Sequence, residues 1–369
     1  MRVGYVIPVK ESSVSGLVRA SVKYAELLST TFCNDICIFI FSPYIEQKIT
    51  FNGFDILPIS SFFHYTEGTE KLDLVHFHGG YIYDFYNMAR ICCKVNIPYI
   101  YSPQGELMYY AQHYKRLKKI VGNILYHNKF VKRAAAVHFL NENECLNGKH
   151  WCKSYFILPN IVEMSDRMIG VGRTFNSDKC PVFLFVGRMD IFHKGIDLLL
   201  LALYKVRANF SKNIKLFLVG PEHNSNDFRK IVEFIHRCDL HDCVSLLGLK
   251  SPEQITQIMN DVDYYIQTSR WEGQSLSILD ALSAGLPCIV TKQTNMENLI
   301  RKYNAGWVCD LDAAEISNNI LNALNVHNEY DVMSQNAKVL FRNEFNTKII
   351  INNLMENYKR IIVNKNGRY

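Results

Sequence analysis

The chain has 369 residues, of which 48% are hydrophobic and 21% are charged, with a net charge of +6. This composition excludes an intrinsically disordered protein, and the length favours two domains over a single hydrophobic core. No apolar run reaches the roughly 18 residues that a membrane-spanning helix needs.

Targeting and redox signals predict a cytoplasmic protein. The N-terminal segment MRVGYVIPVK lacks the long apolar region and the small-residue cleavage site of a signal peptide. The eleven cysteines are scattered and mostly lie in apolar runs, which predicts free, buried thiols in a reducing compartment. Cys33 and Cys37 have no second ligand pair nearby, so we expect no zinc site.

Short runs rich in Val, Ile, Phe and Tyr alternate with helical stretches along the first half of the chain. The predicted strands are residues 2–9, 35–42, 73–78, 97–102, 134–141 and 154–160, and the predicted helices are residues 16–29, 83–95 and a basic segment after residue 107. Strands that alternate with helices indicate crossover connections, and therefore a parallel sheet.

Residues 160–179 are polar and rich in turn-forming residues, which predicts a linker. A second alternating set follows, with strands at 180–187, 214–220, 244–248, 263–269 and 287–291, helices after residue 194, at 228–238, from 252 and at 276–284, and three polar-faced helices towards the C-terminus. The sequence thus predicts an α/β protein with two doubly wound domains, residues 1–165 and 175–345. Ligands of such sheets bind beyond the carboxyl ends of the strands.

Two cations follow the first strand of the second domain. The segment FVGRMDIFHKG places Arg188 and Lys194 between a strand and a helix. Because both side chains can reach one point beyond the strand, beside the free N–H groups of a helix N-terminus, this loop is suited to a diphosphate.

Two carboxylates flank the start of a later helix, in the segment RWEGQSLSILDALSAGLPCIVT. Glu272 precedes the helix and Asp280 lies about two turns inside it, so both can accept hydrogen bonds from hydroxyl groups of a ligand at the helix mouth. Ser275 is the expected N-cap, and Gly285 with Pro287 is the expected helix end. The backbone N–H groups of Gly273, Gln274, Ser275 and Leu276 suit a phosphate.

The first domain contributes glycines and polar residues at its strand ends. Gly16 follows the first strand, His78 ends a later strand, and Gln104 and Gly105 follow another. Glycine lets the backbone approach a ligand closely. His76 and His78 lie on the same face of their strand, and we expect His78 to be the functional one because it is nearer the strand end.

A basic window without acidic residues lies between Leu107 and Asn141. It contains Lys115, Arg116, Lys118, Lys119, Lys129, Lys132 and Arg133, with apolar residues at helical spacing, namely Leu117, Ile120, Val121, Ile124 and Leu125. Two interpretations fit: a core helix with a solvated basic side, or a surface helix that rests on anionic lipid headgroups. In the second, Lys115, Arg116, Lys118 and Lys119 contact the membrane. No motif supports nucleic-acid binding.

The quoted segments resemble one family. VGRMDIFHKGIDLLLLAL and SRWEGQSLSILDALSAGLPCIVT, together with DLVHFHGG, IPYIYSPQG, AAVHFLNENE and ILPNIVE, resemble the glycosyltransferase group-one family, which is family four of the retaining, nucleotide-sugar-dependent enzymes. The resemblance implies the GT-B fold, two Rossmann-like domains facing across a cleft without a metal. It also implies that residues 346–369 form a helix that returns to the N-terminal domain.

The resemblance implies residue roles as well. Arg188 and Lys194 would bind the diphosphate of a UDP- or GDP-sugar, Glu272 would contact the donor sugar, and Asp280 would hold the ribose. The chain departs from the family in having Asp280 where glutamate is usual, and Gln104 where many members have histidine. Glutamine cannot exchange a proton, which argues against acid–base catalysis at that position.

The predicted activity is that of a metal-independent, retaining glycosyltransferase of the hexosyltransferase type. Family habit suggests a lipid-linked saccharide acceptor and a role in bacterial surface-polysaccharide synthesis (lipopolysaccharide O-antigen or capsule) at the inner face of the cytoplasmic membrane. Two alternatives are a nucleotide-sugar epimerase on the same fold and a non-catalytic sugar-binding subunit. The runs Asp261–Asp263 and Asp310–Asp312 lie at predicted helix–strand junctions, where capping explains them better than a metal.

Overall fold

The computed structural model describes residues 1–10, 15–68, 70–162, 175, 179–209, 213–326 and 329–366. The chain divides into two compact units, one formed by Met1–Ile161 with Thr347–Tyr369 and the other by Val162–Asn346. Helix α15 (Thr347–Asn366) therefore belongs to the first unit, although it follows the second unit in the sequence. The linker predicted at residues 160–179 lies largely outside the described residues.

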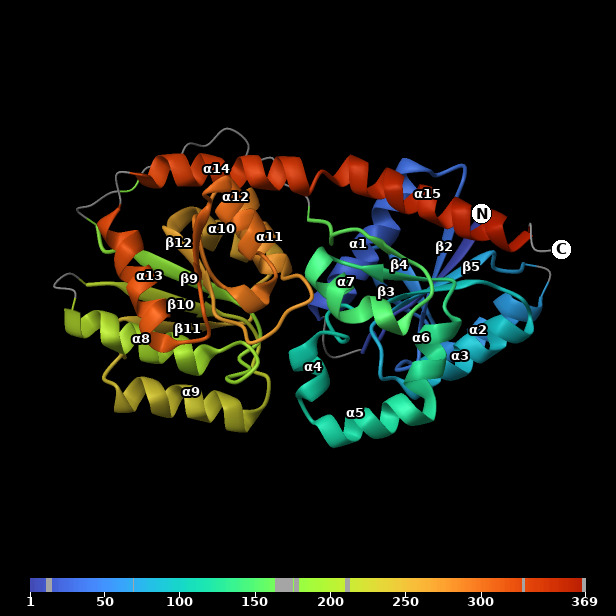
Figure 1. The fold of residues 1–369 in the computed structure, drawn as a ribbon, viewed down its shortest axis with the longest axis horizontal. Helices are drawn as coiled ribbons and strands as arrows, with labels where there is room; N and C mark the ends of the chain where they lie inside the picture. Colours follow the sequence, from blue (N-terminus) through green and yellow to red (C-terminus); the bar gives the residue numbers. More distant parts are fainter. Residues whose placement is uncertain are drawn as a thin grey trace. The chain divides into compact units, whose positions relative to one another are not determined.

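The first unit is built on an eight-stranded sheet of order β3-β4-β2-β1-β5-β6-β7-β8. Figure 1 labels β2, β3, β4 and β5 of this sheet. Its strands are β1 (Arg2–Val6), β2 (Cys37–Ser42), β3 (Ile49–Phe51), β4 (Phe54–Pro58), β5 (Leu74–His78), β6 (Tyr99–Ser102), β7 (Ala136–Phe139) and β8 (Tyr155–Ile157). β3 and β4 pair antiparallel and the other neighbours pair in parallel. The strand order reverses between β1 and β5.

The helices of the first unit cover both faces of this sheet. Besides α15, they are α1 (Gly16–Thr31), α2 (Ile59–Glu67), α3 (Tyr83–Lys94), α4 (Tyr109–His113), α5 (Arg116–Gly122), the π-helical turn η1 (Asn123–His127), α6 (Asn128–Arg133), α7 (Glu142–Gly148) and the 3₁₀ turn η2 (Lys149–Trp151). Residues of α1 and α15 pack in one core cluster with β1, and residues of α3 and α6 pack in another with β5 and β6.

The second unit is built on a six-stranded parallel sheet of order β11-β10-β9-β12-β13-β14. Its strands are β9 (Val182–Val186), β10 (Lys215–Val219), β11 (Val244–Gly248), β12 (Tyr264–Gln267), β13 (Cys288–Thr291) and β14 (Gly306–Cys309). Its helices are α8 (Ile196–Asn209), α9 (Ser225–Arg237), α10 (Pro252–Asp261), α11 (Leu276–Ser283), α12 (Glu297–Tyr303), α13 (Ala313–Asn325) and α14 (Tyr330–Glu344), with the 3₁₀ turn η4 (Lys292–Thr294).

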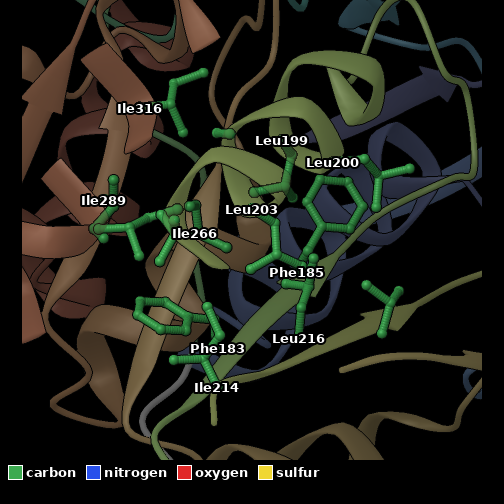
Figure 2. Close-up of a cluster of buried hydrophobic side chains, with 14 of the residues drawn as sticks. Phe183, Phe185, Leu199, Leu200, Leu203, Ile214, Leu216, Ile266, Ile289 and Ile316 are labelled. Atoms are coloured by element: carbon green, nitrogen blue, oxygen red, sulfur yellow. The ribbon is translucent and has the colours of Figure 1, made fainter. Parts of the chain in front are cut away.

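Side-chain alternation along β9 explains why helices cover both faces of the second sheet. Phe183 and Phe185 belong to the core cluster on one face, whereas Leu184 belongs to the cluster on the other. Figure 2 shows Leu199 and Leu203 of α8 close to these phenylalanines. Because both faces of β9 are buried, its residues form a continuous apolar run rather than an alternating one.

Three local predictions were wrong. The sequence analysis missed β3, β4 and α2, although Asn52 and Gly53, with φ of 47° and 77°, form a tight turn of the Asn-Gly type that favours hairpins. It also missed β14 and predicted three helices after Thr291, where the described residues form α12, α13, α14 and α15. All eleven cysteines are free, as predicted, but Cys33, Cys37 and Cys93 are exposed, and Cys152, Cys180 and Cys238 are only partly buried.

A buried chain of hydrogen bonds crosses the first sheet. The carbonyl group at one end of it determines which group donates and which accepts in each bond. His138 Nε2 lies 2.8 Å from the carbonyl oxygen of Leu158, which can only accept, so His138 carries its proton on Nε2. His138 Nδ1 then accepts from Ser102 Oγ at 2.8 Å. Ser102 in turn accepts from His76 Nε2 at 2.8 Å, so the unprotonated nitrogen of His76 is Nδ1.

The other end of this chain lies on α15. The Tyr358 hydroxyl donates to His76 Nδ1 at 2.7 Å and accepts from the Tyr5 hydroxyl at 2.7 Å. Burial lowers the pKa of His76 well below its usual value, which keeps the ring neutral and fits this assignment. Tyr358 therefore couples α15 to β1 and β5 through directed polar bonds as well as apolar packing.

Replacing Tyr358 with phenylalanine should destabilise the first unit. The change leaves a buried acceptor on His76 and a buried donor on Tyr5 without partners, which should cost about 1–3 kcal/mol of unfolding free energy. Urea unfolding of Tyr358→Phe beside Tyr204→Phe, an exposed tyrosine on α8, measures the difference. Equal stability of the two variants would contradict the assigned chain.

Candidate functional site

The predicted cations and acid of the second unit lie at the point where the strand order reverses. β9 and β12 are neighbours in the sheet, while their sequence successors β10 and β13 lie on opposite sides of them. Arg188 and Lys194 follow β9, and Glu272 follows β12. A reversal point of this kind is where doubly wound sheets bind their ligands.

Lys194 and Glu272 form a largely buried ion pair, with 2.5 Å between Nζ and Oε1 and side-chain exposures of 14% and 11%. Oε1 also accepts hydrogen bonds from Gln267 Nε2 at 2.8 Å and Ser269 Oγ at 2.7 Å. Burial alone would raise the pKa of Glu272, but Lys194, His193 and these hydrogen bonds outweigh it and lower the pKa. Within the described residues no donor reaches Oε2, so this oxygen can accept a ligand hydroxyl.

The loops that carry this ion pair are fastened to each other. Thr268 Oγ1 contacts the carbonyl oxygens of Lys194 and Gly195 at 3.2 and 3.0 Å. Gly195 has φ of +65°, and a Cβ there would overlap the Thr268 carbonyl oxygen, so only glycine fits. His193 stacks on Trp271 with 4.2 Å between ring centroids and contacts its carbonyl oxygen through Nε2 at 2.9 Å. These contacts hold Lys194 in place beside Glu272.

Two arginines near this ion pair differ in whether an acidic side chain neutralises them. Arg270 is held by Asp197 through two hydrogen bonds of 2.8 and 2.7 Å, so its charge is neutralised within the fold. Arg188 is exposed, and no described residue forms an ion pair with it. Of these two guanidinium groups, Arg188 is the one available to a ligand.

The N-terminus of α11 has no side-chain cap. Ser275 occupies the N-cap position as predicted, but its hydroxyl donates to Gln267 Oε1 at 2.9 Å instead of accepting from the helix backbone. The predicted capping bond was therefore wrong, because a buried amide oxygen of β12 competes for the hydroxyl. A helix start without a side-chain cap suits an anion.

The remaining predicted residues of this loop lie beside the helix start. Gly273 and Gln274 immediately precede Ser275, and Asp280 lies one turn beyond Leu276 on the same side of α11, where it is partly exposed. The helix ends at Ser283 and is followed by Gly285 with φ of +74°, as predicted.

In the first unit, the strand order reverses between β1 and β5, where Gly16 and His78 are placed. A Cβ at Gly16 would meet no atom within 4 Å, so packing does not require glycine there. His78 is fully buried, and neither ring nitrogen has a hydrogen-bond partner among the described residues. Burial holds the pKa of His78 well below its usual value, so the ring is neutral and lies 4.9 Å from Tyr5 and 4.1 Å from His76 between centroids.

The loop after β6 carries Gln104 and Gly105 in left-handed conformations, with φ of 53° and 90°. The N–H of Gly105 donates to a carboxylate oxygen of Glu144, and the N–H of Leu140 donates to the other at 2.7 Å. Gln104 Nε2 is buried and makes no hydrogen bond among the described residues. The Glu144 carboxylate thus anchors the backbone beside an amide nitrogen that has no hydrogen-bond partner among the described residues.

Glu106 is a candidate residue that the sequence analysis missed. Burial raises its pKa to about 7, although Lys119 acts in the opposite direction. Tyr101 donates its hydroxyl to Glu106 Oε2 at 3.3 Å. A Cβ at Gly80 would lie 2.6 Å from Glu106 Oε2 and 2.9 Å from His127 Cε1. The glycine pair in HFHGGY was the signal: Gly80 must lack a side chain because these groups occupy the space.

The basic helical segment is not a core helix. Its apolar residues Leu117, Ile120, Val121, Ile124 and Leu125 are 41% to 80% exposed, which contradicts the interpretation that this stripe packs inward. Lys115, Arg116 and Lys118 are exposed, whereas Lys119 is partly buried over the Tyr81 ring, 4.6 Å from its centroid. None of the described helices combines the length and apolar character needed to cross a bilayer.

One group of side chains in the described residues could hold a metal ion. Ligand atoms of Asp190, His223 and Asp227 lie within 4.8 Å of one another. His223 Nε2 pairs with Asp190 Oδ2 at 3.6 Å, and Asn224 donates to Asp227 at 3.0 Å. These internal contacts account for the cluster without an ion.

The two Asp-x-Asp runs have structural partners. Asp312 caps α13 by accepting from the N–H groups of Ala314 and Glu315, as predicted. Asp310 pairs with Lys292 at 2.7 Å. Asp263 accepts from the N–H of Val182 at 2.8 Å, which fastens the start of β9 rather than a helix end.

Comparison with known proteins relates the second unit to one family. A family model described as Glycosyl transferases group 1 matches residues 173–340, which include Arg188, Lys194 and Glu272. The second unit therefore resembles the group 1 glycosyl transferases over most of its length.

Curated relatives of the chain match at low identity. The chain is 26% identical over 203 residues to the Escherichia coli UDP-Gal:alpha-D-GlcNAc-diphosphoundecaprenol alpha-1,3-galactosyltransferase, covering 55% of this chain and 50% of that protein. It is 25% identical over 179 residues to the GDP-mannose:cellobiosyl-diphosphopolyprenol alpha-mannosyltransferase of Xanthomonas oryzae pv. oryzae, covering 47% and 46%. The chain thus spans about half the length of these relatives.

Structural similarity extends over nearly the whole chain. The sucrose-phosphate synthase of Thermosynechococcus elongatus matches with a TM-score of 0.76 at 14% identity, covering 98% of this chain and 99% of that one. The chain therefore has the GT-B fold, with two Rossmann-like domains, as predicted.

The raised pKa of Glu106 predicts a pH dependence of stability. Between the usual glutamate pKa of 4.5 and the folded-state value of about 7, the folded chain keeps a proton that the unfolded chain has released, so stability falls as pH rises. Between about pH 5 and pH 7, the unfolding free energy of the wild type should therefore fall with rising pH more steeply than that of Glu106→Gln. The difference in slope should be about 1.4 kcal/mol per pH unit. Urea unfolding at several pH values measures this difference. The exposed Glu142→Gln variant is the control, and it should follow the wild type. If the unfolding free energies of Glu106→Gln and wild type change equally with pH, the raised pKa of this carboxyl group is contradicted.

Proposed function

We propose that this chain is a group 1 glycosyltransferase, a metal-independent, retaining enzyme of the hexosyltransferase type, which moves a sugar from a UDP- or GDP-sugar to a lipid-linked saccharide. The observation that carries the proposal is the Lys194–Glu272 ion pair beside the α11 N-terminus, at the reversal point of the second sheet. It joins a cation, an acceptor oxygen and backbone donors at one place, which is what a sugar diphosphate requires.

Each group then has a task in the transfer. Negative charge develops on the diphosphate as the bond to the anomeric carbon breaks, and Arg188, Lys194 and the N-terminus of α11 stabilise that charge. Glu272 Oε2 accepts a hydrogen bond from a hydroxyl of the donor sugar, and Asp280 holds the ribose. Retention follows from attack on the face that the diphosphate leaves, with a phosphate oxygen taking the acceptor proton.

The first unit supplies groups for the acceptor side in this proposal. His78, Gln104 and Gly105 lie at its strand ends, and Gln104 Nε2 and both His78 nitrogens make no hydrogen bonds among the described residues. Buried polar groups are normally hydrogen-bonded, so sugar hydroxyls are suitable partners. Gly16 takes part by leaving room for the donor, since packing does not explain the glycine.

The nature of donor and acceptor is supported by the relatives. Two of them are named for UDP-Gal or GDP-mannose and for a saccharide linked through a diphosphate to a polyprenol or undecaprenol. We extend these classes to this chain, with a role in bacterial surface-polysaccharide synthesis, such as lipopolysaccharide O-antigen or capsule. Its place would be the inner face of the cytoplasmic membrane, where such lipid acceptors are accessible.

Removing either cation should weaken nucleotide diphosphate binding. Arg188→Ala and Lys194→Ala should each raise the dissociation constant for UDP or GDP by about 10- to 100-fold, because a charge-assisted hydrogen bond to phosphate is lost. Calorimetric titration measures the effect, with Lys230→Ala as control because Lys230 is exposed on α9. Wild-type affinity in both variants would rule out this diphosphate site.

The reaction class is decided by incubation with a panel of nucleotide sugars, with and without a lipid-linked saccharide and in the presence of EDTA. Donor consumption that requires the acceptor and persists in EDTA supports a metal-independent transferase. Isomerisation without acceptor would indicate an epimerase. If no donor–acceptor pair reacts, the interpretation as a non-catalytic sugar-binding subunit is favoured.

The exposed apolar stripe of α5 and η1, flanked by lysines, supports peripheral attachment to an anionic membrane. Changing Lys115, Lys118 and Lys119 to glutamate should weaken binding to phosphatidylglycerol vesicles at least about tenfold, since each cation near the surface contributes about 1 kcal/mol. Co-sedimentation measures binding. A matched control changes Lys94, Lys153 and Lys359 to glutamate. These lysines are exposed elsewhere on the first unit. Equal losses in both variants would show a non-specific charge effect.

A further inference from the structure

A hollow on the first unit lies between two helical segments and contains none of the residues assigned above to the donor or the saccharide. Its volume is about 590 Å³, and it is lined by Tyr83, Tyr86 and Arg90 of α3 and by Leu125, Lys129 and Arg133 of η1 and α6. On each segment the lining residues are three or four positions apart, so they share one helix face. The two faces therefore converge on a single hollow.

The charges of this hollow are unbalanced. Arg90, Lys129 and Arg133 are exposed, and no described residue forms an ion pair with any of them. The segment that supplies two of them has no acidic residue between Leu107 and Asn141. Cations brought together without a counter-charge repel each other, and an anion between them removes that repulsion.

The chemistry of the lining favours phosphate as this anion. Two of the three cations are arginines, whose planar guanidinium donates two parallel hydrogen bonds to phosphate oxygens. The Arg90 guanidinium lies 5.9 Å from the Tyr86 ring centroid, and Tyr83 is 57% exposed, so the rim also offers phenol groups. Three cations on two helices suit a diphosphate better than a single phosphate.

The hollow is continuous with an apolar surface. Leu125, which lines it, is 64% exposed and is also the last member of the exposed stripe Leu117, Ile120, Val121, Ile124 and Leu125. A free anion needs no such neighbour, whereas the hydrocarbon chain of a lipid does. This continuity favours a phosphate group carried by a lipid.

We propose that this hollow, the α3–α6 groove, binds the diphosphate of a lipid whose chain lies along the apolar stripe. The identity of that lipid as the acceptor anchor rests on the proposed function. The groove would then hold the anchor, while the groups at the strand ends hold the saccharide.

The test compares vesicles that differ only in the headgroup. The wild type is co-sedimented with phosphatidylcholine vesicles doped with a long-chain prenyl diphosphate, with the matching prenyl alcohol, or with enough phosphatidylglycerol to match the charge of the first. The groove variant changes Arg90, Lys129 and Arg133 to glutamine. Its control changes Lys94, Lys132 and Lys153 to glutamine, because Lys94 and Lys132 lie on α3 and α6 outside the groove.

The expected result is at least about tenfold tighter binding to prenyl diphosphate vesicles than to charge-matched vesicles. This preference should disappear in the groove variant and persist in the control, while both keep wild-type melting temperatures and nucleotide binding. No preference in the wild type, or its persistence in the groove variant, would overturn the proposal. If the groove variant loses the preference, but the wild type binds inorganic diphosphate more tightly than it binds the prenyl diphosphate vesicles, the groove is a diphosphate site and the lipid assignment is overturned.

A separate measurement distinguishes this proposal from the proposed function. If sugar transfer to a soluble saccharide acceptor is retained but the vesicle preference is absent, only the groove assignment fails. If the preference depends on the groove but no donor–acceptor pair reacts, the diphosphate-lipid site stands and the transferase assignment fails.

Discussion

The buried ion pair between Lys194 and Glu272 is the constraint around which the second unit is arranged. Removing two charges from water is costly, and the cost is offset only when the remaining bonding capacity is satisfied. Gln267 and Ser269 provide that satisfaction at Oε1. These residues come from β12 and its loop, whereas Lys194 comes from the loop after β9, so the pair exists only because the topology makes the two strands neighbours.

The first unit solves the burial of polar groups differently. Burial lowers the pKa of His76 and of His138, which keeps both rings neutral, and the Leu158 carbonyl group sets the direction of their hydrogen bonds, so no charge is enclosed along that chain. His78 and His127 are buried without partners among the described residues. At the strand ends, therefore, the second unit presents charged groups to the expected donor diphosphate, and the first unit presents neutral hydrogen-bonding groups to the expected saccharide.

The sequence predicted most of what depends on local pattern. The parallel α/β organisation and the positions of Arg188, Lys194 and Glu272 followed from apolar runs and from the residues after them. The hydroxyl of Ser275 was misassigned because its partner, Gln267, lies on the preceding strand. The stripe from Leu117 to Leu125 was periodic in either interpretation, since periodicity identifies an apolar face but not what covers it. Glu106 was missed because its environment comes from Gly80, Tyr101 and His127.

The return of α15 to the first unit has a consequence for biosynthesis. His76 cannot receive its hydroxyl donor until Tyr358 has left the ribosome, after the whole second unit has been translated. The amino-terminal sheet must therefore wait, with one face incompletely covered, while the later Rossmann-like half is able to complete its own core. Nascent chains of this protein would then mature in an order that is not the order of synthesis.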